Sequence, residues 1–282
     1  MLPFQIIDAH FHLWDPERLT YPWLDEYPTL KRRFGTDDLT TALGSVMFEG
    51  GIVVQADCDP KQSADEVAWI SSLAESYSGV EGIVAHAALE KGRDVVSDLD
   101  EIKKNPLVKG VRRLLQDEDP DFMLQDSFVV GVQALAGADL SFDLCVRHSQ
   151  LPQTIELVKK CPDVRFVLDH GGKPDIKNQL RDPWMDHIHE LAQSSNVWCK
   201  LSGLVTEADH ETWKPFRLKP YIDRILECFD YERTMFGSDW PVATLASNYT
   251  QWIDALMWAI DGCRESQMMR LFRNSAREFY RI

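Results

Sequence analysis

The chain has 282 residues, of which 44% are hydrophobic and 27% charged, and its formal net charge is −15 at pH 7. These proportions are typical of a globular protein with a large core and exclude the disordered and fibrous classes. The negative charge disfavours nucleic acid and anionic membranes as partners, although a local group of arginines can still attract an acidic small molecule.

The N-terminal segment lacks the basic start and the long apolar stretch of a signal peptide. No run approaches the ~20 apolar residues that span a bilayer. The six cysteines are scattered without a C-x-x-C pair, which predicts buried, reduced thiols. We therefore expect a cytoplasmic protein.

Eight short apolar runs recur along the chain, with segments of helical periodicity between them. The runs cover residues 5–13, 51–57, 82–89, 108–115, 140–148, 164–172, 196–203 and 233–241. Continuous apolar runs are typical of strands buried on both faces. Their alternation with helices predicts a parallel (β/α)8 barrel that forms a single domain over residues 1–282. An open doubly wound sheet would need a Gly-rich turn after its first strand, where the sequence reads DAHFHLWD.

Helix signals are clearest in the segments that follow the second, fifth, sixth, seventh and eighth runs. Ser63 and Glu66 form a capping-box pattern at the start of a helix over 63–77. Asp182 is the expected cap of a helix over 182–195, with Pro183 at its first position. Apolar spacing predicts the remaining helices over 151–161, 220–229, 248–261 and 266–282.

Two connections are long, at residues 13–36 and 203–219. The first carries Trp14 and Trp23. Long loops that follow strands in a barrel lie over its C-terminal mouth and shape the substrate site.

Histidines gather at the ends of the predicted strands, where barrel enzymes place their reactive groups. His10 and His12 are two residues apart at the end of the first run, so they project together and could bind a metal or a carbonyl oxygen. The alternative is a pair of structural histidines. His86, His148 and His170 lie at or near the ends of three further runs, and their convergence on one rim favours a functional site.

Asp239 ends the eighth run, next to the first strand of a closed barrel, and can therefore meet His10 and His12. The alternative for Asp239 is a turn or a helix cap, because Ser-Asp-Trp-Pro is also a turn sequence.

Four motifs, DAHFHLW (8–14), LDHGGKP (168–174), FGSDWP (236–241) and NSAREFYRI (274–282), together resemble the amidohydrolase superfamily. Within it the chain is similar to the branch that contains sugar lactonases acting on L-fucono-, L-rhamnono- and related lactones. The resemblance covers nearly the whole chain and keeps the order His-x-His, His, Asp.

This resemblance implies that Asp239 is the acid/base that takes a proton from the hydrolytic water. It implies that His10, His12 and His170 bind one divalent ion, with zinc as the expected metal, or polarise the lactone carbonyl directly in metal-free relatives. The ligand set would be His10, His12 and Asp239 with His170 or His148. Binuclear members use a lysine from the fourth strand, whereas Lys109 lies too near the start of that run to bridge two ions. We therefore expect at most one ion, which the reaction could dispense with.

Further residues are candidates for substrate binding. One of Arg112 and Arg113 should point into the mouth and the other outward, and the sequence does not say which. The setting R-x-x-Q-L-P favours Arg147 over His148, which related zinc decarboxylases would use as a fifth-strand ligand. Gln55 and His86 either line the pocket or make turn contacts.

Three more side chains have two interpretations each. Trp14 and Trp23 either stack on a sugar ring or pack the first loop. Lys173 either contributes its positive charge to the site or stabilises a turn.

The leading hypothesis is hydrolysis of a sugar lactone to its aldonic acid by a small-molecule enzyme of carbohydrate metabolism. One alternative is a metal-dependent, non-oxidative decarboxylase of an aromatic or unsaturated acid, which needs His148 as a ligand. Another is a non-catalytic barrel that binds a sugar acid. The exact sugar and the formation of a homo-oligomer stay open.

Overall fold

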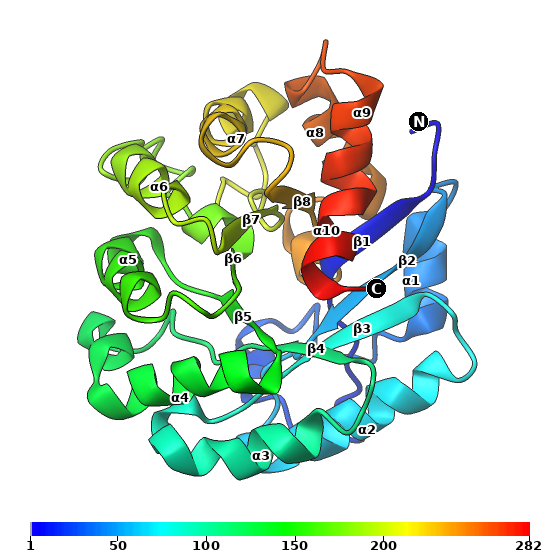
Figure 1. Cartoon of the computed structure of the whole chain (residues 1–282). Helices are drawn as coiled ribbons and strands as arrows, with labels where there is room; N and C mark the ends of the chain where they lie inside the picture. Colours follow the sequence, from blue (N-terminus) through cyan, green and yellow to red (C-terminus); the bar gives the residue numbers. More distant parts are fainter. Residues whose placement is uncertain (1) are drawn as a thin grey trace.

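The computed structural model describes residues 2–282 and shows a (β/α)8 barrel (Figure 1). The eight strands form one sheet in chain order, and neighbouring strands are parallel. They are β1 Ile6–Phe11, β2 Phe48–Val54, β3 Val80–Ala85, β4 Val108–Val111, β5 Ser141–Leu144, β6 Phe166–Leu168, β7 Val197–Leu201 and β8 Thr234–Phe236. Each strand overlaps one of the apolar runs, and the predicted fold is confirmed.

The barrel is nearly closed where the last strand meets the first. The His12 amide donates to the Trp240 carbonyl at 2.7 Å, and the Asp239 amide donates to the His10 carbonyl at 2.8 Å. These two bonds continue the ladder just beyond the ends of β1 and β8. They also hold the first and the last predicted site motifs side by side.

Helices surround the sheet (Figure 1). The α-helices are α1 Thr36–Leu43, α2 Ser63–Ala74, α3 Val95–Ile102, α4 Asp126–Ala138, α5 Leu151–Lys160, α6 Trp184–Ala192, α7 Pro215–Phe229, α8 Tyr249–Ala259, α9 Glu265–Met269 and α10 Ser275–Tyr280. Short 3-10 turns are η1 Pro22–Glu26, η2 Pro60–Gln62, η3 Leu89–Asp94, η4 Pro120–Leu124, η5 His148–Gln150, η6 Asp169–Gly172 and η7 Val242–Leu245, and η8 Arg270–Asn274 is a π turn.

Two predicted helix caps are wrong. Gln62 rather than Ser63 precedes α2, the Ser63 hydroxyl donates to the Pro60 carbonyl, and the buried Glu66 carboxyl accepts the Ala56 amide at the end of β2. The Glu66 carboxyl therefore binds the backbone just after β2 and does not cap the start of its own helix.

At α6, Pro183 occupies the cap position without a side-chain bond, so Asp182 does not cap this helix. The helix predicted over 220–229 begins five residues earlier, at Pro215, and contains Pro220. The long loop predicted over 203–219 is correspondingly shorter and ends at Lys214. The helix predicted over 266–282 is divided into α9, η8 and α10.

The barrel interior contains a separate apolar cluster that the C-terminal helix completes. Alternate strand residues supply its wall, and α10 adds the last three members: Ile7, Ala9, Ile52, Val54, Val84, Val167, Met235, Ala276, Phe279 and Tyr280. In Figure 1 the red helix α10 lies in front of the strand ends near β1. This end of the barrel is therefore filled by packing and leaves the opposite end for a site.

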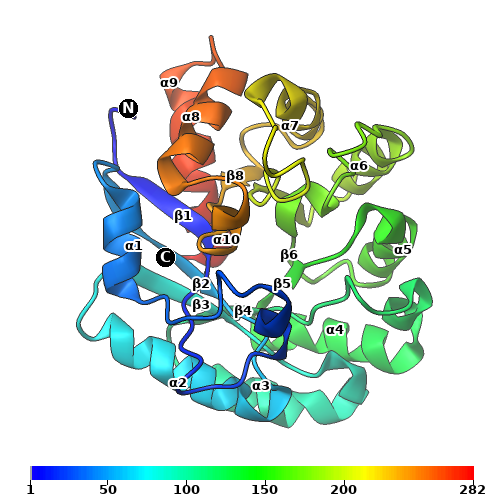
Figure 2. The same ribbon diagram turned by 180° about the vertical axis from the view of Figure 1, so that it is seen from behind.

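The first long loop lies at that opposite end, and Figure 2 shows it in dark blue in front of the strands. The loop contains η1 and is anchored by Trp14, which is fully buried and whose backbone pairs with Phe34. The Trp14 indole donates to the Arg32 carbonyl at 2.9 Å.

None of the helices formed by residues 2–282 has the length and apolar character that crossing a membrane requires.

Candidate active site

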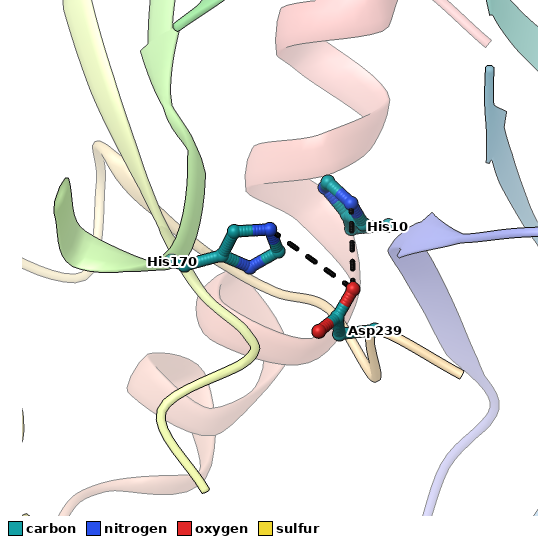
Figure 3. A group of neighbouring side chains, drawn as sticks. All are labelled: His10, His170 and Asp239. Carbon is teal, nitrogen blue, oxygen red and sulfur yellow. Dashed lines mark ion pairs between the residues drawn. The ribbon is translucent and has the colours of Figure 1, made fainter. Parts of the chain in front are cut away.

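Four side chains predicted from the sequence meet at the mouth of the barrel. Asp239 Oδ1 lies 3.7 Å from His10 Nε2, 3.5 Å from His12 Nε2 and 4.0 Å from His170 Nε2. Figure 3 shows His10 and His170 converging on the Asp239 carboxylate. All four residues are at most 5% exposed. One carboxylate is thus surrounded by three imidazoles in a nearly dry setting.

A bulge in β1 sets the direction of the histidine pair. The pairing of β1 with β2 shifts register between Asp8 and Phe11, which releases the His10 amide from the ladder. The Asp8 carboxylate accepts that amide at 3.0 Å and the Ser238 amide at 2.9 Å, while the Tyr249 hydroxyl of α8 donates to its second oxygen. Asp8 therefore ties β1 to the start of the segment that carries Asp239.

His170 and Asp239 both sit on strained backbone. Their φ angles are 54° and 56°, in the left-handed region that L residues seldom adopt. Gly203 packs against both, because a Cβ there would lie 2.5 Å from His170 Nδ1 and 3.0 Å from Asp239 Oδ2. Such strain persists only where surrounding structure enforces it and is common at functional sites.

Hydrogen bonds fix how two of the rings present their nitrogens. His12 Nδ1 lies 2.7 Å from the Val54 carbonyl, which can only accept, so this nitrogen carries the proton and Nε2 carries the lone pair. His170 Nδ1 lies 2.9 Å from the Ser202 hydroxyl. In both cases Nε2 is left to face Asp239.

Burial sets the charge state of the cluster. It lowers the pKa of His170 to about 4, and it also lowers the pKa of His12 and, much further, of His10. Burial would raise the pKa of Asp239, but the His170, His12 and His10 imidazoles outweigh it and hold this pKa well below its ordinary value. Near neutral pH the site therefore combines neutral imidazoles with an ionised carboxylate.

The donor set fits one divalent ion of the zinc type. Ligand atoms of His10, His170 and Asp239 all lie within 4.8 Å of one another. Imidazole nitrogens and a carboxylate oxygen are ordinary zinc ligands. A second group within the same limit consists of Cys145, Asp169 and His170.

His148 belongs to neither group among residues 2–282 and lies half-buried in η5. Cys145 directly follows β5 instead. The sequence placed the fifth-strand residue three positions too late, because the run over 140–148 extends beyond the four-residue strand.

A cavity of about 510 Å³ lies above the cluster and is lined by His12, His170 and Asp239, with His10 just below. Among the predicted substrate-binding residues, Trp14, Trp23, Arg112 and Arg147 line it, as does Lys173. Gln55, His86 and Arg113 do not belong to its lining. The polar lining residues that the sequence did not suggest include Glu26, Asp57, Gln116, Asp117, Glu207 and His210.

The two neighbouring arginines point in different directions. Arg112 is 4% exposed, and its Nη1 lies 3.5 Å from both Asp169 Oδ2 and His10 Nε2. Arg113 instead forms ion pairs with Glu90 at 3.2 Å and Glu118 at 2.6 Å. Arg112 is thus the residue that faces the mouth.

Three of the remaining candidates have structural partners. Arg147 pairs with Asp117 at 2.8 Å at the cavity rim. The Gln55 side chain accepts the Asp57 amide at 2.6 Å, and His86 is half-buried. The Trp23 indole donates to the Ala56 carbonyl at 2.8 Å.

A buried charge cluster beneath the site was missed in the sequence. Lys200 of β7 pairs with Asp143 of β5 and with Asp169, and all three are fully buried. The sequence does contain an indication of this cluster, because each of its residues is a charge inside an otherwise apolar run, as in VWCKL and LSFDL. Fully buried charges are rare unless they are paired.

Comparisons with known proteins agree with this geometry. Residues 7–282 match the family model described as amidohydrolase. An L-fucono-1,5-lactonase of Burkholderia ambifaria is 30% identical, over 98% of this chain and 95% of that protein. The L-rhamnono-gamma-lactonase of Scheffersomyces stipitis is 24% identical over the full length of both chains.

A solved amidohydrolase of Burkholderia multivorans, determined with bound zinc, is 29% identical. It superposes with a TM-score of 0.88, with 99% of this chain and all of that chain covered. The family model covers nearly the whole chain, and the chain therefore belongs to the amidohydrolase family.

Proposed function

We propose that the protein hydrolyses a sugar-derived lactone to the open aldonic acid, with Asp239 as general base and then general acid. The observation that carries this proposal is an ionised carboxylate facing three neutral imidazoles at the floor of a polar cavity. The related L-fucono-1,5-lactonases and L-rhamnono-gamma-lactonase support the substrate class.

The cavity suits a polyhydroxylated ring. Carboxylates and amides on its wall, such as Glu26, Asp57 and Gln116, can accept or donate hydrogen bonds to hydroxyl groups. The half-buried Trp23 offers aromatic surface on one side, where the C–H bonds of a sugar ring can stack, whereas the fully buried Trp14 packs the first loop behind it.

Asp239 performs both proton transfers in this proposal. It first removes a proton from the water that attacks the lactone carbonyl carbon. It then delivers that proton to the ring oxygen, which leaves as the C–O bond breaks. One carboxylate suffices because the group that is protonated in the first step is the acid needed in the second.

Arg112 is placed to stabilise the oxyanion of the tetrahedral intermediate. Its Nε has no hydrogen-bond partner within residues 2–282, although the side chain is almost completely buried. A fixed cation in a dry site stabilises developing negative charge strongly. It also tolerates the carboxylate of the product.

His10, His12, His170 and Asp239 are the residues that would hold a zinc ion, which would add Lewis-acid stabilisation of the carbonyl oxygen. His12 and His170 would otherwise contact that oxygen themselves, with their ring orientation fixed by Val54 and Ser202.

The geometry favours hydrolysis over the decarboxylase alternative. A decarboxylase needs His148 as a metal ligand, and His148 lies outside both the groups of candidate ligands and the lining of the cavity, whereas His12 lines the cavity and lies 3.5 Å from Asp239. Binding of a sugar acid without catalysis does not require an ionised aspartate among three imidazoles.

A panel of aldonolactones tests the proposal. L-fucono-1,5-lactone, L-rhamnono-gamma-lactone and their diastereomers are supplied to the enzyme, and acid release is followed with a pH indicator, with and without prior treatment with a chelator. We expect turnover of at least one 6-deoxy-sugar lactone above its spontaneous opening. Failure of the whole panel, with zinc-loaded and chelated protein alike, would refute the proposal.

A further inference from the structure

Four consecutive residues after β6 form a left-handed turn that carries two side chains of the cavity. His170, Gly171, Gly172 and Lys173 have φ angles of 54°, 57°, 72° and 49°. The Lys173 amide closes the turn by donating to the His170 carbonyl at 3.0 Å. In a turn of about three residues, side chains three positions apart lie on the same side. Lys173 therefore lies on the side on which His170 faces Asp239, and both line the cavity.

A chain of hydrogen bonds along one cavity wall holds the Lys173 ammonium group in place. Lys173 Nζ donates to Gln116 Oε1, and Gln116 Nε2 donates to Asp117 Oδ2 at 3.1 Å. Arg147 Nη2 donates to the other oxygen of Asp117 at 2.8 Å. An ammonium group has three hydrogens, so the bond to Gln116 leaves two of them for a ligand in the cavity.

Glu207 offers a hydrogen-bond acceptor to the same space. It follows β7, is half-buried and lines the cavity together with Lys173. Among the residues that the structure describes, its carboxylate forms no ion pair, and the nearby Arg147 pairs with Asp117 instead. Burial lowers the pKa of Lys173, but Cys145 and the Glu207 and Asp239 carboxylates outweigh burial and raise that pKa. The cavity wall thus presents a cation and, near it, a carboxylate that the cation does not bind.

A hydroxyl group suits this pair of charges. Its oxygen can accept a hydrogen bond from Lys173 while its hydrogen is donated to Glu207. A carbonyl or carboxylate oxygen can accept from the lysine but has no hydrogen for the glutamate. A C–H group in the same place would leave both charges without a partner, and a site built to bind a hydroxyl group rejects an analogue that lacks it.

We propose that Lys173 and Glu207 are specificity-determining residues, which together bind the hydroxyl group on the carbon next to the lactone carbonyl. The left-handed turn places Lys173 beside His170, and the hydroxyl nearest to the carbonyl of an aldonolactone is the one on C2. The substrates are accordingly lactones of 2-hydroxy acids, and a lactone without this hydroxyl is a poor substrate. This inference rests on the proposed function for the position of the carbonyl group.

A cycle of two proteins and two substrates tests the contact. We would measure kcat/KM of wild type and Lys173→Met with L-fucono-1,5-lactone and with its 2-deoxy analogue. Lys173→Met should lower kcat/KM for the parent lactone about 10- to 100-fold, the usual effect of losing a hydrogen bond to a charged group. For the 2-deoxy lactone the two proteins should agree within about twofold. Equal losses with both lactones, or no loss with either, would overturn the proposal.

Glu207→Met is a second variant, which decides the question if Lys173→Met fails to fold. It removes the acceptor at nearly constant side-chain length and should also lower kcat/KM for the parent lactone alone, again about 10- to 100-fold. Lys159→Met is the matched control, because Lys159 is exposed on α5 and pairs with Glu190. The control should behave as wild type with both lactones.

Calorimetric titration with the product acids separates this test from the lactone panel. L-fuconate and 2-deoxy-L-fuconate are titrated into wild type and Lys173→Met, and the variant should bind L-fuconate alone about 10- to 100-fold more weakly. This measurement needs no turnover. A protein that distinguishes the two acids through Lys173 but opens no lactone would refute the proposed function alone. An active lactonase in which Lys173→Met weakens binding of both acids equally, or of neither, would refute this inference alone.

Discussion

Asp239 combines two properties that are seldom found together, namely an ionised carboxylate in a dry pocket and a left-handed backbone. Asparagine has nearly the same shape and adopts the left-handed region more readily than most residues. Asp239→Asn therefore removes the base without disturbing the turn between β8 and η7. The imidazoles around this carboxylate are kept neutral near pH 7 by burial, so the amide leaves no buried charge unpaired.

We expect Asp239→Asn to lower kcat for the best lactone about 100- to 10,000-fold, the usual contribution of a positioned general base. The melting temperature should stay near that of wild type. Steady-state kinetics and thermal unfolding measure the two effects. Asp254→Asn, an exposed change on α8, is the matched control and should leave both unchanged. Wild-type turnover by the Asp239→Asn variant would remove Asp239 from the mechanism.

At the residue scale, the sequence reveals those site residues that interrupt an apolar run at its end. His10, His12, His170 and Asp239 all do so. It could not distinguish Arg112 from Arg113, because the direction of a residue just past a strand depends on where the strand ends. Lys200 was overlooked for a different reason: its charge stands out inside the apolar run VWCKL, but only the fold brings its partners Asp143 and Asp169 to it.

At the scale of elements, the connection after β7 positions the connections after β6 and β8. Gly203 follows Ser202 with φ +59° and leaves no room for a side chain beside His170 and Asp239. A methyl group at position 203 must push apart the side chains of His170 and Asp239, which have to converge on one substrate. A displacement of about 1 Å can reduce a rate about 100-fold.

Gly203→Ala should therefore lower kcat about 100-fold in lactone hydrolysis. Gly44→Ala is a closely matched control, because Gly44 has φ +54° but a Cβ there would meet nothing within 4 Å. Both variants should lose about 1–2 kcal/mol of unfolding free energy from backbone strain. Only Gly203→Ala should lose activity, and equal activity of the two variants would show that the close packing has no catalytic effect.

Glu66 of helix α2 makes the unfolding free energy of the protein depend on pH. Burial raises the pKa of this carboxyl to about 7. The folded protein therefore holds a proton on Glu66 between the ordinary pKa of about 4.5 and about pH 7, where the unfolded chain does not. The stability that Glu66 contributes is full below this window and is lost as the pH rises through 7.

Glu66→Gln should remove that pH dependence while its carbonyl oxygen still accepts the Ala56 amide. Relative to wild type, the variant should gain roughly 2–3 kcal/mol of unfolding free energy between about pH 5 and about pH 9. Urea unfolding at both pH values measures this difference, and other titrating groups cancel between the two proteins. Glu75→Gln, exposed at the end of the same helix, should follow wild type. Parallel pH profiles of Glu66→Gln and wild type would contradict the prediction.

At the scale of the whole molecule, one end of the barrel is filled and the other is open. Periodicity predicted the eight strands and most helices because burial on two faces imposes continuous apolar runs. It did not predict that α10 would fill the barrel interior, since an amphipathic pattern does not identify the surface against which a helix packs. The C-terminal residues thereby join the strands that carry the site.

Phe279 tests how strongly this closure stabilises the molecule. It is 1% exposed, and its ring centroid lies 5.1 Å from that of Trp198 and 4.8 Å from that of Tyr280. Phe279→Ala opens a cavity at the closed end and should cost about 3–5 kcal/mol of unfolding free energy. Urea unfolding followed by tryptophan fluorescence measures it.

Phe216→Ala is the matched control, because Phe216 on α7 is 59% exposed, and it should change the unfolding free energy by about 0.5 kcal/mol or less. The contrast isolates burial, since the same atoms are removed in both variants. If Phe279→Ala lowered the unfolding free energy no more than the control does, packing of α10 against the barrel would not stabilise the fold. The measured difference between the two variants therefore tells whether the last turn of the chain belongs to the folding core.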